Sequence, residues 1–180
     1  MAVEMGHGFQ PTGATAVPAQ QIKLGTPVPV SGQAVSYSRD DLLVGEVVEV
    51  SGSASKMLLD AKQIAKLGDA ADQAVAMAGQ VGAQVKIRVG HVWLLASIRE
   101  EQLHPRDSSL IIATVDFLGE GDEEKLTGRI FNFRRGVTRF PVPGSQVYAA
   151  TTNDLKQIYA ADERPHIEIG TVYPTKDIRG

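Results

Sequence analysis

The segment GRIFNFRRGVTRFPVPGSQVY, residues 128–148, carries the strongest structural constraints in this chain of 180 residues. Its first part alternates apolar with polar or basic side chains, a period of two that is typical of a β-strand. Gly136 and the run Pro141-Val142-Pro143-Gly144 follow, and a second strand-like run ends the segment. Because proline and glycine preset the backbone angles of turns, the segment predicts the last long strand of a barrel, a turn, and the start of the next strand.

Strand signals on both sides of this segment predict a mainly β fold, a small antiparallel β-barrel. β-Branched and aromatic residues occur in short runs, and turns rich in glycine or polar residues separate these runs, as in small barrels. We expect strands at residues 43–51, 81–90, 91–98, 108–121, 126–133 and 166–174, the last of which closes the barrel. The segment 56–61 is either a further strand or the start of a helix. The polar segment 100–108 is expected to be a loop, and the acidic segment 121–126 a turn.

Helical signals are few, and one or two short helices are expected beside the barrel. The alanine-rich segment 61–80 favours helix, and because Gly68 interrupts it we expect either two short helical pieces or one helix and a mobile loop. The segment 151–160 predicts a second short helix. Thr152 or Asn153 would cap this helix, because a short polar side chain accepts a hydrogen bond from a free backbone amide of the first turn.

Composition indicates one soluble globular domain behind a flexible N-terminal tail. Residues 1–39 are rich in glycine, proline and alanine and carry few charges, so we expect a flexible tail there and the barrel over residues 40–174. The hydrophobic content of 43% and charged content of 22% are ordinary for a soluble protein. The absence of cysteine excludes disulfides and thiolate chemistry, and a cytoplasmic location is expected. The net charge of −3 means that any binding to nucleic acid must use a local basic surface.

The motifs of common catalytic and metal sites are missing from the sequence. The nearest imitation of a phosphate-binding loop, residues 52–56, lacks the second glycine and the final hydroxyl. The four histidines, His7, His91, His104 and His166, are far apart and form no pair with metal-ligand spacing. No Gly-x-Ser-x-Gly turn presents a nucleophile. We therefore expect no catalytic, cofactor-binding or metal-ligating residue in this chain.

Basic and aromatic residues interleave between positions 129 and 140. The residues concerned are Arg129, Phe131, Phe133, Arg134, Arg135, Arg139 and Phe140. In one interpretation Phe131 and Phe133 face the core while the arginines pair with acids on the wet face. In a second, the strand binds single-stranded nucleic acid by base stacking and phosphate contacts. In a third it belongs to a protein interface, where arginine and aromatic residues are enriched.

The order of these signals along the chain resembles a known family. The matching runs are Val44–Val50, Val81–Ile87, Phe117–Gly119, Phe133–Gly144, Asp154–Tyr159 and His166–Thr171. Together they resemble the N-terminal HAS-barrel of HerA-like ATPases of the FtsK/HerA superfamily. The most specific part is the Arg-Gly-Val run that leads into Phe-Pro-Val-Pro-Gly, followed by the Asp-Leu-x-x-Ile-Tyr helix and the Ile-Gly-Thr strand.

The resemblance implies a role in assembly and not in catalysis. In that family a RecA-like motor with the phosphate-binding loop follows the barrel, so residues 175–180 would begin a linker to it, and ATP and Mg²⁺ would belong to the motor. Six barrels would crown a hexameric DNA translocase or helicase, through which DNA passes. They would dock a partner such as a NurA-like nuclease or a defence effector, in DNA repair and end processing or in antiphage defence. A stand-alone nucleic-acid-binding barrel is the alternative.

The same resemblance assigns roles to residues of the segment 128–148. Candidates for a ring interface or for the lining of a DNA channel are Arg129, Arg134, Arg135, Arg139 and Phe140. The residues expected to fix the shape of the loop are Gly136, Pro141, Pro143 and Gly144. No membrane contact is implied.

Overall fold

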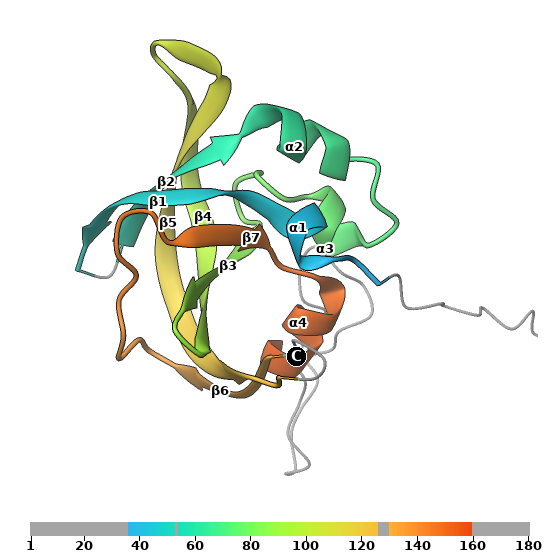
Figure 1. Cartoon of the computed structure of the whole chain (residues 1–180), viewed down its shortest axis with the longest axis vertical. Helices are drawn as coiled ribbons and strands as arrows, with labels where there is room; N and C mark the ends of the chain where they lie inside the picture. Colours follow the sequence, from blue (N-terminus) through green and yellow to red (C-terminus); the bar gives the residue numbers. More distant parts are fainter. Residues whose placement is uncertain (1–35, 53, 126–129, 160–180) are drawn as a thin grey trace, which may run out of the picture. The chain divides into compact units, whose positions relative to one another are not determined.

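The computed structural model describes residues 36–52, 54–125 and 130–159, which form a mainly β domain (Figure 1). Its elements are α1 (Arg39–Leu42), β1 (Leu43–Ser51), β2 (Ala54–Asp60), α2 (Ala61–Leu67), α3 (Gln73–Ala76), β3 (Gln84–Val89), β4 (Val92–His104), β5 (Asp107–Glu123), β6 (Ile130–Arg135), β7 (Gln146–Ala149) and α4 (Thr152–Tyr159). The flexible tail is predicted over residues 1–39, of which the described residues 36–39 lead into α1. The remainder of the tail, the strand predicted at 166–174 and the linker from 175 lie outside the described residues.

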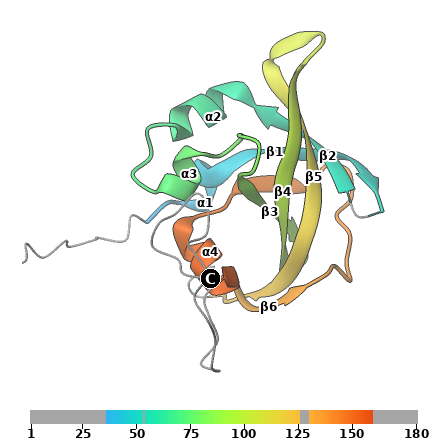
Figure 2. The same cartoon turned by 180° about the vertical axis from the view of Figure 1, so that it is seen from behind.

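Six of the strands close into an antiparallel barrel, as the sequence predicts. The sheet runs in the order β2-β1-β7-β3-β4-β5-β6, and an additional pairing of β2 with β5 closes the ring. Every strand pair in it is antiparallel. The prediction that the segment 128–148 holds the last long strand of the barrel is wrong, because β6 has only six residues and pairs outside the ring with β5. Figure 2 shows β5 curving along the barrel from its pairing with β2 to its pairing with β6.

The hairpin of β4 and β5 extends beyond the end of β3 as an arm, which we define as residues 99–110 (Figures 1 and 2). The base of the arm belongs to the barrel, because β5 pairs with β2 as far as Leu110. The sequence predicts a polar loop at 100–108, and this prediction is wrong. Residues Glu100 to Leu103 continue β4 and pair with β5 from Thr114 to Ile111. The segment lacks alternation because both of its faces are exposed, so backbone pairing alone makes it a strand. An acidic turn is predicted at 121–126, but β5 continues to Glu123, so the first three of these residues belong to the strand.

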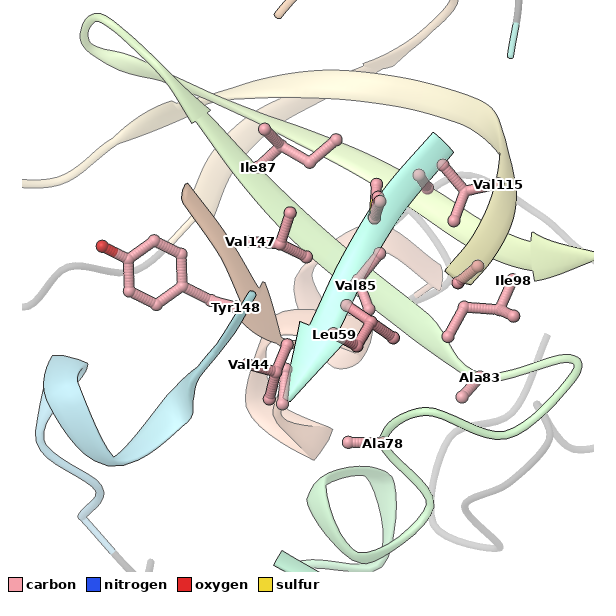
Figure 3. Packing of buried hydrophobic residues seen from close by; sticks show 14 of the residues in the cluster. Val44, Leu59, Ala78, Ala83, Val85, Ile87, Ile98, Val115, Val147 and Tyr148 are labelled. Atoms are coloured by element: carbon pink, nitrogen blue, oxygen red, sulfur yellow. The ribbon is translucent and has the colours of Figure 1, made fainter. Parts of the chain in front are cut away.

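The core fills the inside of the barrel with aliphatic side chains from opposing strands. One buried cluster contains aliphatic residues that are at most 1% exposed and come from different strands: Val44, Leu59, Val85, Ile87 and Val147 (Figure 3). Successive side chains of a strand point to opposite faces, so Val85 and Ile87 of β3 face the core while Gln84 and Arg88 face away from it. Full burial of one such side chain stabilises the fold by about 1.5–3 kcal/mol, so this cluster is the main source of cohesion.

Helices α2 and α3 arise from the alanine-rich segment, and its division into two pieces is confirmed. Each begins at an aspartate whose carboxylate accepts hydrogen bonds from the first-turn amides, Asp60 for α2 and Asp72 for α3. The short α1 is not predicted from the sequence. It is held by a capping box in which Ser38 and Asp41 bond each other's backbone amides.

Helix α4 is found where the sequence places it, but its cap differs from the prediction. Thr151, and not Thr152 or Asn153, accepts the amide of Asp154 at 3.1 Å through its hydroxyl. The amide of Thr152 instead donates to the carboxylate of Asp72 at 2.9 Å, which joins the start of α4 to α3. The Asp154 carboxylate accepts the Lys86 ammonium at 2.8 Å in a buried pair. Thr151 and Asp154 bond each other's backbone amides, a local capping box, whereas the bond to Asp72, 80 residues away, has no local sequence signal.

The close pairing of β1 and β2 gives a stability prediction. A Cβ atom at Gly45 would lie 2.0 Å from the carbonyl oxygen of Leu58, so Gly45→Ala must push the two strands apart. We expect it to lower the free energy of unfolding by about 3 kcal/mol. At Gly136 φ is +85° and no atom lies within 4 Å of the Cβ position, so Gly136→Ala should cost only about 1 kcal/mol. Urea denaturation followed by circular dichroism measures both, and equal losses would contradict the packing argument.

Candidate interaction surface

The loop between β6 and β7, residues 136–145, presents apolar and basic side chains to solvent. Phe140 is 49% exposed and Val142 is 66% exposed. Arg139, between Thr138 and Phe140, is exposed as well, whereas Pro141 is buried against the barrel. We call Arg139, Phe140, Val142 and the adjoining Val48 the loop surface. Large apolar side chains beside an arginine are the composition expected at the centre of a protein interface.

The buried carboxylate of Glu120 fixes the start of this loop. Glu120 lies on β5 and is 0% exposed. It accepts the Arg134 Nε at 2.9 Å, and the Arg134 Nη2 also donates to it. The backbone amide of Thr138 donates to the same carboxylate at 3.0 Å and the Thr138 hydroxyl at 2.7 Å. One side chain thereby ties β6 and the loop to β5.

These contacts change the acidity of Glu120. Burial of the carboxyl group, the largest single influence, raises its pKa, but hydrogen bonds from Thr138 and the charge and hydrogen bonds of Arg134 together outweigh it. The net result is a pKa lowered from 4.5 to about 2. Hydrogen bonding to the ionised form is the physical reason, since the donors lose their partner when the carboxylate binds a proton.

The far end of the loop is pinned to β1. The Gly144 amide donates to the Val47 carbonyl at 2.7 Å, and the Val47 amide donates to the Ser145 carbonyl at 2.9 Å. The Ser145 hydroxyl accepts the Val142 amide at 3.0 Å. Gly144 has a φ of +87°, a conformation that favours glycine and explains its place after Pro143. The loop surface is therefore held at both ends and not left to move freely.

Two further contacts complete the surface. The ring of Phe140 meets Phe117 of β5 edge-on, with centroids 6.0 Å apart. Such a contact contributes about 0.5–1.5 kcal/mol beyond burial, and it holds one face of Phe140 on the barrel while the other stays in water. Val48 is the extra residue where the register of β1 against β2 shifts between Val47 and Glu49, and it is 38% exposed. The preceding Val47 is fully buried, so the alternation of side chains along β1 points Val48 outward.

The structure separates the arginines that the sequence groups together. Arg129 lies outside the described residues. Arg134 is occupied by Glu120, whereas Arg135 and Arg139 are exposed and form no salt bridge within the described part of the chain. The interpretation that the arginines pair with acids therefore holds for Arg134 alone among the described arginines of this segment.

The two phenylalanines of β6 also differ in their surroundings. Phe133 is partly buried and contacts the small cluster around Leu95 and Leu155. Phe131 is 42% exposed and does not face the core. Asn132 between them has a φ of +51°, and at this point two residues of β6 face Gly121 of β5. This bulge breaks the alternation from which a common core face was predicted.

Sequence reasoning missed a cluster around the single tryptophan. Trp93 is 2% exposed, and the guanidinium groups of Arg39 and Arg88 lie 5.8 and 5.6 Å from its ring centroid. Both arginines bind the carboxylate of Glu123, Arg39 at 2.6 Å and Arg88 at 2.8 Å. The Lys86 ammonium is 5.0 Å from the same ring. This arrangement joins α1 to β3, β4 and β5 away from the loop surface, so we assign it a structural role.

Comparison with known proteins adds no assignment. The chain matches no model of a known protein family, and no curated protein matches it. Among the described residues, no group of three or more histidine, aspartate or glutamate side chains could hold a metal ion. No helix in the described ranges has the length and apolar character needed to cross a membrane.

The contacts of Glu120 predict a dependence of stability on pH. We expect Glu120→Gln to lower the free energy of unfolding at pH 7 by about 2 kcal/mol, because it removes hydrogen bonds to a charged group. The folded pKa lies below 4.5, so this stabilisation is present above about pH 5 and is lost as the pH falls toward about 2. The difference between wild type and variant should therefore shrink between pH 5 and pH 3.

Urea denaturation at pH 7, 5 and 3 measures this difference. The control is Glu101→Gln, an exposed carboxylate on the arm, which should change stability by less than about 0.5 kcal/mol at each pH. A pH-independent difference for Glu120→Gln would mean that its contacts to Arg134 and Thr138 do not stabilise the fold.

Proposed function

We propose that this chain is a non-catalytic HAS-barrel that serves ring assembly and partner docking in a HerA-like hexameric DNA translocase. The family resemblance of the sequence motivates the proposal, and the closed barrel with a fixed, exposed loop surface supports it. In this proposal the natural protein carries a RecA-like motor that binds ATP and Mg²⁺. DNA passes through the ring, and a NurA-like nuclease or a defence effector docks on the barrels in the cytoplasm.

The loop surface is the observation that carries the proposal. A closed barrel has few free strand edges, so contacts with other proteins must use its loops and side chains. Arginine and aromatic residues such as Arg139 and Phe140 are enriched at protein interfaces, and Val142 adds apolar area beside them. Because Glu120 and Val47 hold the loop, little conformational entropy is lost when a partner binds it.

The position of Arg134 favours a protein interface over a free-standing site for nucleic acid. Its guanidinium is committed to Glu120, which cancels its charge. Arg135 and Arg139 are left for phosphate contacts, and two such contacts give weak, strongly salt-sensitive binding. Phe140 already uses one edge contact with Phe117 and is only half exposed for base stacking.

Assembly of the natural protein tests the proposal. We expect it to form a ring with nucleotide, measured by size-exclusion chromatography with light scattering, and its sequence to contain a phosphate-binding loop beyond residue 180. Phe140→Asp with Val142→Asp should weaken assembly or docking about tenfold or more, because each places a charge at the centre of the contact. Phe131→Asp is the matched control, since Phe131 is 42% exposed but lies on β6 outside the loop surface.

Two results would overturn the proposal. A natural protein that stays monomeric with nucleotide has no ring for the barrel to assemble. Salt-dependent binding of single-stranded DNA to the chain, lost in Arg135→Ala with Arg139→Ala while the double aspartate variant leaves the oligomeric state unchanged, would favour the stand-alone nucleic-acid-binding barrel.

A further inference from the structure

Large exposed apolar side chains share one place on the described part of the barrel, the loop surface, and occur singly at other places. Six large apolar side chains are between 38% and 66% exposed: Val48, Val81, Leu103, Phe131, Phe140 and Val142. Three of them belong to the loop surface. Leu103 lies on β4 in the arm, Val81 lies in the turn before β3 next to the residue that bonds Ile98, and Phe131 is alone on β6. Single exposed apolar residues are common on proteins, but grouped ones mark contact sites.

A second candidate for contact is an open edge of β4 on the arm. The pairing of β4 with β3 ends at Ser97, and the last backbone contacts on that side join Ile98 to Gly82 and Ala83. From Arg99 to His104 no other described strand pairs with this edge, while β5 covers the opposite one. Leu103, on this stretch, is 65% exposed, and Val81 at its base is 53% exposed. An open strand edge with exposed apolar side chains is a template for contact with another chain.

The open edge and the loop surface carry charges of opposite sign. Glu101 lies on the same face of the arm as Leu103, two residues away, and forms no salt bridge among the described residues. Glu100 reaches only Arg99, at 3.7 Å, and its side chain is 71% exposed. The loop surface has Arg139, also without a salt bridge in the described part of the chain. Beside Leu103, β4 thus carries the negative charge of Glu101, while Arg106 lies in the turn at the tip of the arm. The charge of Glu101 is complementary to that of Arg139 on the loop surface.

We propose that the arm of one copy of this chain docks on the loop surface of a second copy, with Leu103 against Phe140 and Val142 and with Glu101 facing Arg139. This inference rests on the proposed function and identifies the contact between neighbouring copies in its ring, which we call the seam. The two surfaces are different, so the contact is head-to-tail and can repeat from copy to copy. The arm projects at the top of the view in Figure 1 while the loop runs along the left between β6 and β7, so one copy can use both at once.

The outer edge of β6 is a weaker candidate for this seam. Asn132 sits there in a left-handed conformation at the bulge opposite Gly121, and a bulge bends an edge away from a partner strand. Arg134 on the same strand is committed to Glu120. Phe131 lines an open depression of about 510 Å³ with Ile130, Gln157 and other residues, away from the loop surface.

Cysteine cross-linking tests the seam directly, because the chain has no native cysteine. The variants Leu103→Cys and Val142→Cys are made in the full chain, mixed, and oxidised. We expect a disulfide-linked dimer in the mixture and little in either variant alone, since head-to-tail contact brings position 103 against position 142 and neither against itself. Phe131→Cys mixed with Leu103→Cys is the control. Equal cross-linking in that control, or none in the Leu103→Cys and Val142→Cys mixture, overturns the seam.

Charge reversal separates this inference from the proposed function. Glu101→Arg, and likewise Arg139→Glu, should weaken self-association about tenfold or more, and the double variant should restore it, because the pair is then reversed and still attractive. Sedimentation velocity over a range of protein concentrations measures this. If the natural protein still forms its ring in each single variant, the seam is wrong and the proposed function stands. If the wild-type natural protein forms no ring, the proposed function itself fails.

Discussion

The pairing of β2 with β5 is the constraint on which the rest of the structure depends. Seven matched positions, from Ala54 opposite Asp116 to Asp60 opposite Leu110, convert an open sheet into a closed ring. Closure encloses the aliphatic core and satisfies the backbone groups of both strands. It also decides where the protein can meet others, because β6, the tip of the arm, the connecting loops and helices α1 to α4 lie outside the ring.

Within the closed barrel, the carboxylate of Glu120 determines the position of the loop surface. Hydrogen bonds from Arg134 and Thr138 hold the loop against β5, and the backbone of Val47 holds its other end. In the ion pair of Glu120 with Arg134 only the carboxylate is buried, and the cost of removing it from water offsets part of the attraction. Its value here is geometric, since it fixes the direction in which Arg139, Phe140 and Val142 are presented.

The sequence predicts the barrel well and the site only in part, for physical reasons. Period-two patterns report which face of a strand is buried, so β1, β3 and β5 were found from the side chains of residues such as Val44, Val85 and Val115. The arm was missed because its two faces are both exposed and Glu100–Gln102 carry no alternation. The position of β6 outside the ring, and the pairing of Arg134 with Glu120, depend on contacts between distant residues that no local pattern encodes.

Side-chain type located the candidate surface, but packing decided which residues remain available on it. Arg134 and Arg139 look equivalent in the sequence, but Arg134 forms a salt bridge with Glu120 whereas Arg139 is exposed to solvent. The same reasoning extends to the arm, where an exposed leucine and an unpaired glutamate complement the loop.

Hydrogen exchange at rising protein concentration tests most directly that this barrel assembles through the arm and the loop surface. Amides of residues 99–104 and 137–145 should become protected together as concentration rises, while amides of the core strands, already protected, should not change. Protection confined to other surfaces, or exchange that is independent of concentration in both segments, would contradict the account.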